Sequence, residues 1–157
     1  MTKNKFIPYK IANFSSEELI EKSKKYFQEI NKRRSVRDFS NRDVPKEVIE
    51  NIIKTAGSAP SGAHKQPWTF CVISDAKLKS KIRKLAEKEE FENYHGRMSD
   101  SWKADLQHFG TDHIKEFLEV APYLIIVFKK VFDLDEEDNK SQNYYVNESV
   151  GIACGFL

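Results

Sequence analysis

Two short apolar runs constrain the fold of this 157-residue chain more than any other feature. They cover residues 68–73 and 123–128, and charged residues hardly interrupt them. Their β-branched and aromatic residues predict two strands, each covered on both faces. The chain around these strands has helical patterns. The sequence therefore predicts an α/β or α+β fold, with helices around a central sheet and more helix than strand.

Three segments carry signals for the start of a helix. Ser15 and Glu18 have the spacing of a capping box, which predicts a helix that begins there and ends after residue 30. Pro45 is a good first-turn residue, and the apolar residues after it follow helical spacing as far as Gly57. A long charged helix is predicted from about Asp75.

The charged helix has two predicted faces. We expect its aliphatic residues to be buried (Leu78, Ile82 and Leu85). We expect its many cations to form a solvated surface (Lys77, Lys79, Lys81, Arg83, Lys84 and Lys88). Beyond this helix, residues 95–110 contain few aliphatic side chains, which indicates a mobile lid-like region, and a short helix is predicted over residues 112–120.

The last quarter of the chain contains an acidic run and an apolar helix. Residues 133–138 lack the central glycine of a calcium loop, so we interpret them as a solvated acidic loop. Residues 144–157 predict a helix that becomes increasingly apolar and ends without a cap. That pattern is unusual for a free C-terminus, and it predicts a chain cut off inside a core helix.

Composition excludes several classes of protein. Lys and Arg number 26 against 24 Asp and Glu, and this near balance argues against a nucleic-acid binder. No apolar run approaches the roughly 20 residues of a membrane span, and residues 1–14 lack the apolar stretch of a secretory signal. Cys71 and Cys154 lie in apolar surroundings, so we predict two buried thiols in a cytoplasmic, reducing environment. The four histidines do not have metal-site spacing, and no metal is expected.

Two clusters carry chemistry. Arg33, Arg34 and Arg37 flank a hydroxyl at Ser35, and guanidinium groups bind phosphate oxygens in a bidentate manner. A compact anion site is one interpretation, and a solvated basic run is the other. Residues 59–64 have the sequence Ala-Pro-Ser-Gly-Ala-His, which predicts a loop of mostly small residues. Such a loop would let a flat ligand approach the backbone.

Together these clusters, with Gln66-Pro67-Trp68 and the helix that begins at Pro45, resemble the flavin-dependent nitroreductase superfamily. The resemblance extends from about residue 31 to the end. It implies an α+β nitroreductase-like fold, helices around a central mixed sheet, and FMN as cofactor. It further implies that FMN binds Arg33, Arg34, Ser35 and Arg37, and also Pro60, Ser61 and Gly62. Residues 1–30 would be an N-terminal extension with a helix, and residues 31–157 the N-terminal part of one FMN-binding domain.

A finer resemblance is to the iodotyrosine deiodinase family, carried by residues 60–64, by Glu90 with Tyr94, by Lys115, and by residues 144–155. It implies that Glu90, Tyr94 and Lys115 bind the amino-acid end of a halotyrosine, and that the Ala63 backbone N–H holds its phenolate. The charges suit that role, because a carboxylate pairs with an ammonium and a lysine with a carboxylate. An exposed charged helix with one tyrosine is the alternative interpretation of these three side chains.

The implied function is FMN-dependent reductive deiodination of mono- and diiodotyrosine. A lid over residues 88–115 and a homodimer with the flavin at the interface are also implied, as is electron supply by NAD(P)H or a reductase. A general FMN-dependent nitroreductase or quinone reductase is the alternative enzyme, and a flavin-binding module without turnover is the alternative from another class. The family pattern continues beyond Leu157, so a hydroxyl residue near flavin N5 and a further phosphate-binding Arg cannot be assigned in this sequence.

Overall fold

The computed structural model describes residues 8–157, which divide into two units, residues 8–36 and residues 37–157. Residues 1–7, part of the stretch considered above for a secretory signal, lie outside the described residues. The first unit holds helix α1 (Ser16–Ile30). The Ser15 hydroxyl accepts a hydrogen bond from the Glu18 backbone N–H at 3.2 Å, and the Glu18 carboxylate accepts from the Ser15 N–H at 2.8 Å. The predicted capping box is confirmed.

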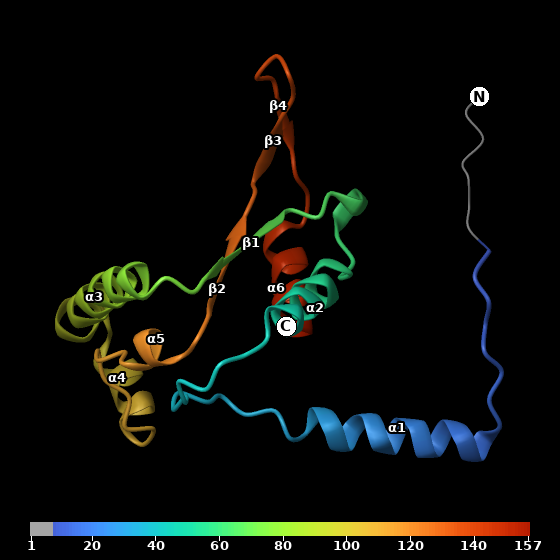
Figure 1. The fold of residues 1–157 in the computed structure, drawn as a ribbon, viewed down its shortest axis with the longest axis horizontal. Helices are drawn as coiled ribbons and strands as arrows, with labels where there is room; N and C mark the ends of the chain where they lie inside the picture. The colour runs from blue at the N-terminus through green and yellow to red at the C-terminus, as the bar shows by residue number, and fades with distance from the viewer. Residues whose placement is uncertain (1–7) are drawn as a thin grey trace. The chain divides into compact units, whose positions relative to one another are not determined.

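In the second unit, helices α2 (Lys46–Gly57) and α6 (Val146–Phe156) pack against one another (Figure 1). Ala56 and Ala153 are fully buried, and their small side chains allow two helices to approach closely. Both helices lie where the sequence predicted them. Helix α6 also contacts strand β2 (Leu124–Lys129), so it joins the helical layer to the sheet.

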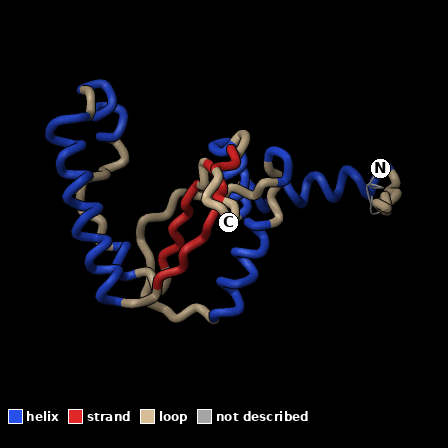
Figure 2. Tube along the Cα trace, turned by 90° about the horizontal axis from the view of Figure 1, so that it is seen from above, coloured by secondary structure: helices blue, strands red, loops and turns tan. Residues whose placement is uncertain are grey.

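Strand β2 pairs with β1 (Trp68–Ile73) in an antiparallel sheet of two strands, with Trp68 opposite Lys129 and Ile73 opposite Leu124 (Figure 2). Both predicted strands are confirmed, and so is the α+β class. The predicted cover on both faces is wrong, because Val72 and Phe128 are 41% and 54% exposed. Both strand pairs in residues 8–157 are antiparallel, so the mixed sheet implied by the resemblance is not formed in this part of the chain.

The predicted burial of the two cysteines is also wrong, since both side chains are exposed. Cys71 is in the uncovered part of β1. Cys154 follows the fully buried Ala153, and one residue along a helix turns the side chain by about 100°, away from the packed face.

The acidic run forms part of a hairpin that the sequence analysis missed. Strands β3 (Phe132–Leu134) and β4 (Lys140–Gln142) pair across it. The Asp135 carboxylate accepts backbone N–H groups of Glu137 and Asn139 at 2.9 and 2.8 Å, which closes the turn. The acidic residues of the turn are exposed to solvent, as predicted, but in an ordered turn.

Helix α3 (Ala76–Glu92) continues into a π-helical turn, η2 (Asn93–Arg97), and is followed by α4 (Asp100–Gln107) and α5 (Phe117–Val120). Residues 95–110, predicted to be lid-like, therefore contain two helical elements. The helix predicted over residues 112–120 is shorter, because the Lys115 backbone N–H donates to a side chain of α3 and not to a carbonyl one turn earlier. In residues 8–157 no helix has the length and apolar character needed to cross a membrane.

The burial predicted for α3 is confirmed in part. Lys77, Lys81, Lys84 and Lys88 are exposed as predicted, and Ile82 is half-buried. Leu78 and Leu85 are 44% and 66% exposed, whereas Lys79 is buried, so the prediction is wrong for these three residues. Lys79 and Arg83 are drawn into the packed face by backbone carbonyls and a carboxylate of residues 119–121.

Candidate active site

A stripe of five polar side chains runs along α3 and η2, at spacings of three and four residues that place them on one face. We call it the α3 stripe: Lys79, Arg83, Glu87, Glu90 and Tyr94. Each member contacts the return segment, residues 111–121, which runs in the opposite direction. Five successive contacts therefore fix the return segment to α3.

Three members of this arrangement are the predicted amino-acid-binding residues. Lys115 Nζ lies 3.3 Å from Glu90 Oε2, with the two side chains 19% and 33% exposed. The Lys115 ammonium also donates to the Asp112 carbonyl oxygen. The Tyr94 hydroxyl lies 3.2 Å from the Thr111 carbonyl oxygen and 3.1 Å from its Oγ1. The chain thus brings Glu90, Tyr94 and Lys115 to one place without a ligand.

A cavity of about 430 Å³ is lined by one of these three residues, Tyr94. Thr111 also belongs to its lining, and the rest comes from α4. The α4 side chains that line it are Asp100, Lys103, Ala104, Leu106 and Gln107. A cavity of ligand size therefore lies beside Tyr94.

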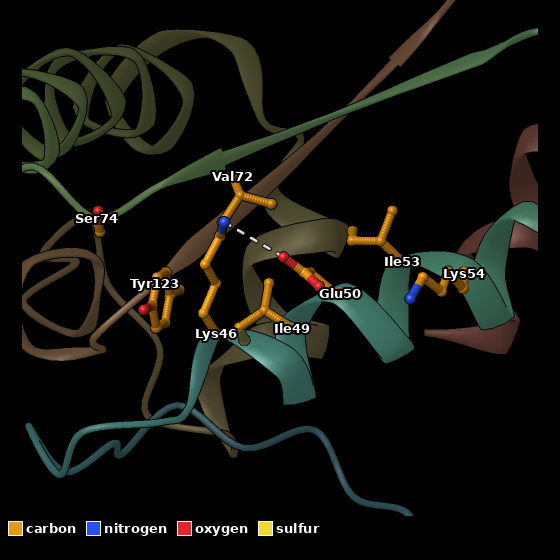
Figure 3. Close-up of a pocket in the computed structure, with 8 residues that line it drawn as sticks. All are labelled: Lys46, Ile49, Glu50, Ile53, Lys54, Val72, Ser74 and Tyr123. Carbon is orange, nitrogen blue, oxygen red and sulfur yellow. Dashed lines mark ion pairs between the residues drawn. The ribbon is translucent and has the colours of Figure 1, made fainter.

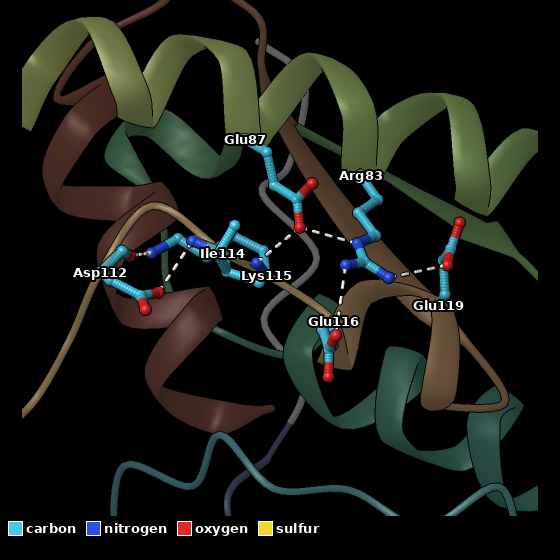
Figure 4. Close-up of polar contacts among 7 residues, drawn as sticks. All are labelled: Arg83, Glu87, Asp112, Ile114, Lys115, Glu116 and Glu119. Carbon is cyan, nitrogen blue, oxygen red and sulfur yellow. Dashed lines mark hydrogen bonds and ion pairs between the residues drawn. The ribbon is translucent and has the colours of Figure 1, made fainter.

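Glu87 is the half-buried junction of the stripe (Figure 4). Its Oε1 accepts the Lys115 backbone N–H at 2.8 Å and the Arg83 Nε–H at 2.7 Å. These two donors, the backbone N–H first, hold the pKa of Glu87 below its ordinary value. Arg83 also donates to Glu119 at 2.9 Å, and the hydrogen bond that Arg83 donates to Glu87 is the main cause of the raised pKa of Arg83.

Arg83, Glu87 and Lys79 were not predicted as site residues, and the expectation that Lys79 and Arg83 are solvated is wrong. Lys79 is 7% exposed, and its ammonium donates to the carbonyls of Glu119 and Ala121 at 3.0 and 2.7 Å. These carbonyls close the end of α5, where a cation is favourable. The four-residue spacing of Arg83 and Glu87 is a sequence signal for their ion pair, whereas no local pattern marks the burial of Lys79.

The loop of small residues is held in a strained backbone form. Ala63 and His64 have φ of 49° and 55°, in the left-handed region. A Cβ on Gly62 would lie 2.8 Å from the Tyr144 carbonyl oxygen, so only glycine fits. The Ser61 hydroxyl accepts the Gln66 backbone N–H at 2.9 Å. The structure thus places Pro60, Ser61, Gly62 and Ala63 in one fixed loop between α2 and β1.

The predicted anion-binding segment, residues 33–37, is not held in a fixed loop of this kind. Residues 33–37 are exposed and have no helical or strand structure. The Arg34 guanidinium donates to the backbone carbonyls of Asn31 and Arg33 at 2.6 and 2.8 Å, which curls it back onto the chain. The side chains of Arg33, Ser35 and Arg37 are open to solvent.

A larger cavity, about 520 Å³, is lined by α2, β1, Ser74 and Tyr123 (Figure 3). Ile49, Ile53 and Val72 give it a mainly apolar wall, and its one ion pair joins Lys46 to Glu50 at 3.3 Å. None of the predicted site residues belongs to it. No group of three or more potential metal ligands occurs within residues 8–157.

The comparison with family models supplies the class of protein. The nitroreductase family model matches residues 30–157, so this chain belongs to the nitroreductase family. Within that family, the iodotyrosine deiodinase of Haliscomenobacter hydrossis is 62% identical over 97% of this chain and 68% of its own length. Iodotyrosine deiodinase 1 of Homo sapiens is 48% identical over 96% of this chain and 52% of its own.

Solved structures agree with the fold. Oxidized iodotyrosine deiodinase bound to FMN and 3-iodo-L-tyrosine superposes with a TM-score of 0.69 and 32% identity, over 83% of this chain and 65% of that one. A BluB-like flavoprotein from Clostridium difficile gives a TM-score of 0.57 and 29% identity. The predicted nitroreductase-like fold is confirmed. The chain spans about half to two thirds of the length of the relatives described here.

Proposed function

We propose that this chain acts as an FMN-dependent oxidoreductase that removes iodine from mono- and diiodotyrosine. The observation that carries the proposal is the ion pair between Glu90 and Lys115, with Tyr94 about one turn further along, in η2. Its support comes from similarity to proteins named iodotyrosine deiodinase. Residues 31–157 form the flavin-binding part in this proposal, residues 1–30 an extension, and residues 88–115 the lid.

The residues of the two predicted flavin clusters fit FMN by the chemistry of their donors. Arg33, Arg34 and Arg37 offer planar cations for a phosphate and for the polar edge of the ring, and Ser35 adds a hydroxyl. Pro60, Ser61 and Gly62 offer a loop with little side chain, where Gly62 leaves no room for a Cβ. When bound, FMN supplies the two electrons that reductive dehalogenation requires.

The chain's own residues recognise the zwitterion. Glu90 binds the substrate ammonium, Lys115 binds the substrate carboxylate, and the Tyr94 hydroxyl adds a hydrogen bond. Binding thus replaces the ion pair between Glu90 and Lys115 by two ion pairs, one between each of these side chains and the ligand. A ligand that carries only one of the two charges leaves Glu90 or Lys115 unpaired in a half-buried place, which is unfavourable.

At the other end of the ligand, the Ala63 backbone N–H donates to the phenolate oxygen. Ala63 is exposed, and its left-handed backbone is fixed by the loop. The overall reaction replaces the aryl C–I bond by C–H, uses two electrons and one proton, and releases iodide and tyrosine. The phenolate contact orients the ring so that the carbon bearing iodine faces the reductant.

A homodimer with its flavin at the interface is part of the proposal, as is NAD(P)H or a partner reductase as electron donor. Large apolar side chains that are exposed in the single chain support an interface, since an interface would cover them. Phe128 and Phe156 in the second unit are 54% and 45% exposed. Sedimentation equilibrium of the flavin-loaded protein tests this part, and a monomer at all concentrations would contradict it.

The test of the function is a titration of flavin fluorescence with diiodotyrosine and with three matched ligands. Tyrosine lacks the halogen, and the iodinated amine and iodinated acid each keep only one charge of the zwitterion. We expect saturable quenching by diiodotyrosine and at least tenfold weaker quenching by each of the others. Flavin that responds equally to all four would favour the general reductase, and binding without iodide release under dithionite would favour a module without turnover.

A variant pair sharpens the test. Glu90→Gln removes the partner of the ammonium, and we expect about thirtyfold weaker diiodotyrosine binding with nitroaromatic reduction within twofold of the parent. Glu89→Gln is the matched control, because Glu89 pairs with Arg97 at the surface, away from Lys115. Equal losses on both substrates would contradict the assignment of Glu90.

A further inference from the structure

The contact between Glu87 and Lys115 lies outside the trio assigned to the substrate, yet it fixes one of its members (Figure 4). The backbone N–H and the ammonium of Lys115 both have partners. Its backbone N–H donates to Glu87 Oε1 at 2.8 Å, and its ammonium lies between the Glu90 carboxylate and the Asp112 carbonyl. The first contact fixes the position of the Lys115 backbone, and the second fixes the position of its ammonium group.

The turn before Lys115 is fixed as well. The Asp112 carboxylate accepts the Ile114 backbone N–H at 2.8 Å, so residues 112–114 form a local turn. Lys115 precedes α5, which begins at Phe117, and its carbonyl accepts the Leu118 N–H at 3.0 Å. The N–H of Lys115 has its partner in Glu87, so α5 fixes one side of this backbone and Glu87 fixes the other.

The charge on Glu87 needs compensation, because a second free carboxylate near Lys115 would compete with Glu90 for the ammonium. Arg83 provides it. Its Nε lies 2.7 Å from the same oxygen that accepts the Lys115 N–H, and its two terminal nitrogens face Glu119 at 2.9 Å and Glu116 at 3.6 Å. Arg83 and Glu87 are only 22% and 20% exposed, so solvent screens this pair less than a surface pair.

We propose that Glu87, neutralised by Arg83, is a positioning residue that holds the Lys115 backbone so that its ammonium stands opposite Glu90 at the spacing of an amino-acid zwitterion. This proposal rests on the proposed function, because the zwitterion is the substrate end assigned there. The rest of the return segment has separate anchors at Lys79 and Tyr94. Loss of the Glu87 contact therefore releases Lys115 without unfolding the segment.

Two variants separate the parts of the contact. Glu87→Ala removes the acceptor of the Lys115 N–H, while Glu87→Gln keeps a carbonyl oxygen that can accept it. Glu89→Ala is the matched control on the same helix, because Glu89 is 63% exposed and pairs with Arg97. All are studied as the full, flavin-loaded chain.

The ligands are 3-iodotyrosine and 2-iodophenol, which share the iodophenol ring but differ in the zwitterion. We expect Glu87→Ala to weaken 3-iodotyrosine binding about tenfold, the loss of one hydrogen bond to a charged group. Binding of 2-iodophenol stays within twofold, and Glu87→Gln recovers most of the loss. Equal weakening of both ligands would mean a general structural role and would overturn the proposal, as would no change in either.

Amide hydrogen exchange of the ligand-free chain gives a readout that needs no ligand. Exchange at Lys115 rises in Glu87→Ala and not in Glu89→Ala if Glu87 fixes this backbone. Unchanged exchange would overturn the positioning role. The parent protein tests the proposed function separately: if it binds 3-iodotyrosine no more tightly than 2-iodophenol, the proposed function is contradicted. Faster exchange at Lys115 in Glu87→Ala would still identify Glu87 as the anchor of Lys115, so the two failures are distinguishable.

Discussion

Two regions of the proposed site are built in different ways. The return segment is assigned to the substrate, and residues 33–37, which we call the arginine segment, are assigned to the flavin. Residues 111–121 are held by five side chains of the α3 stripe, and their charged groups already have partners in the chain. Residues 33–37 are exposed and without regular structure, and their cations face solvent. The return segment is therefore ordered by contacts within the protein. The side chains of the arginine segment would be ordered by contacts with a ligand.

This comparison predicts that substitutions in the arginine segment strongly weaken FMN binding but leave the free energy of unfolding almost unchanged. We expect Arg37→Gln to weaken FMN binding about a hundredfold, because a cation that pairs with phosphate contributes roughly 3 kcal/mol. The free energy of unfolding without FMN stays within about 0.5 kcal/mol of the parent, as for other exposed substitutions. Flavin fluorescence and urea unfolding measure the two quantities.

Lys32→Gln is the control for Arg37→Gln, since Lys32 belongs to the same basic run but pairs with Glu29 at 2.9 Å on the surface. We expect FMN binding within twofold of the parent. Equal losses in both variants would show that FMN senses only the net charge of the segment.

The opposite result is predicted for the return segment. Lys79→Met keeps the length of the side chain but leaves the carbonyls of Glu119 and Ala121 without their cation. An unpaired buried acceptor costs about 1–3 kcal/mol, so the free energy of unfolding should fall by about 2 kcal/mol. FMN binding should change little. Urea unfolding of Lys79→Met beside Lys81→Met, whose side chain is exposed, tests this, and similar stability of the two variants would contradict it.

The same contrast explains how much the sequence could predict. Apolar periodicity and caps located α1, α2, α6 and both strands of the main sheet, because those elements follow local rules. These local rules failed at three positions of α3, where the pattern predicted buried Leu78 and Leu85 and a solvated Lys79, while both leucines are exposed and the lysine is buried. Burial of Lys79 depends on carbonyls about 40 residues away, and no local pattern contains that information.

The candidate site divides in the same way. Glu90, Tyr94 and Lys115 were selected through a resemblance, and the structure brings them together. Glu87 was missed because a hydrogen bond to a distant backbone N–H leaves no mark on residue type, and Arg83 was missed because one of its partners, Glu119, lies 36 residues away. The exposure of Cys71 was missed for another reason: an apolar strand predicts cover, but in residues 8–157 the sheet that contains it has only two strands.

The smallest predicted effect is a pH dependence of stability that comes from the return segment. Contacts in the folded chain lower the pKa of Glu87 and of Glu119; the main donors are the Lys115 backbone N–H for Glu87 and the Ser80 side chain for Glu119. Below the ordinary pKa of a glutamate, about 4.5, the unfolded chain therefore binds more protons than the folded chain. Their contribution to stability is complete above that pH and is lost as the pH falls through the folded pKa values.

Glu87→Gln removes one titrating group from this network while it keeps an acceptor for the Lys115 N–H. We expect the free energy of unfolding to fall less steeply in the variant than in the parent as the pH is lowered from 5 to 3. Glu89→Gln should reproduce the slope of the parent more closely, because that carboxylate lies at the surface. If Glu87→Gln keeps the full slope of the parent, the carboxylate of Glu87 does not hold the return segment in the way that its short contacts to Lys115 and Arg83 indicate.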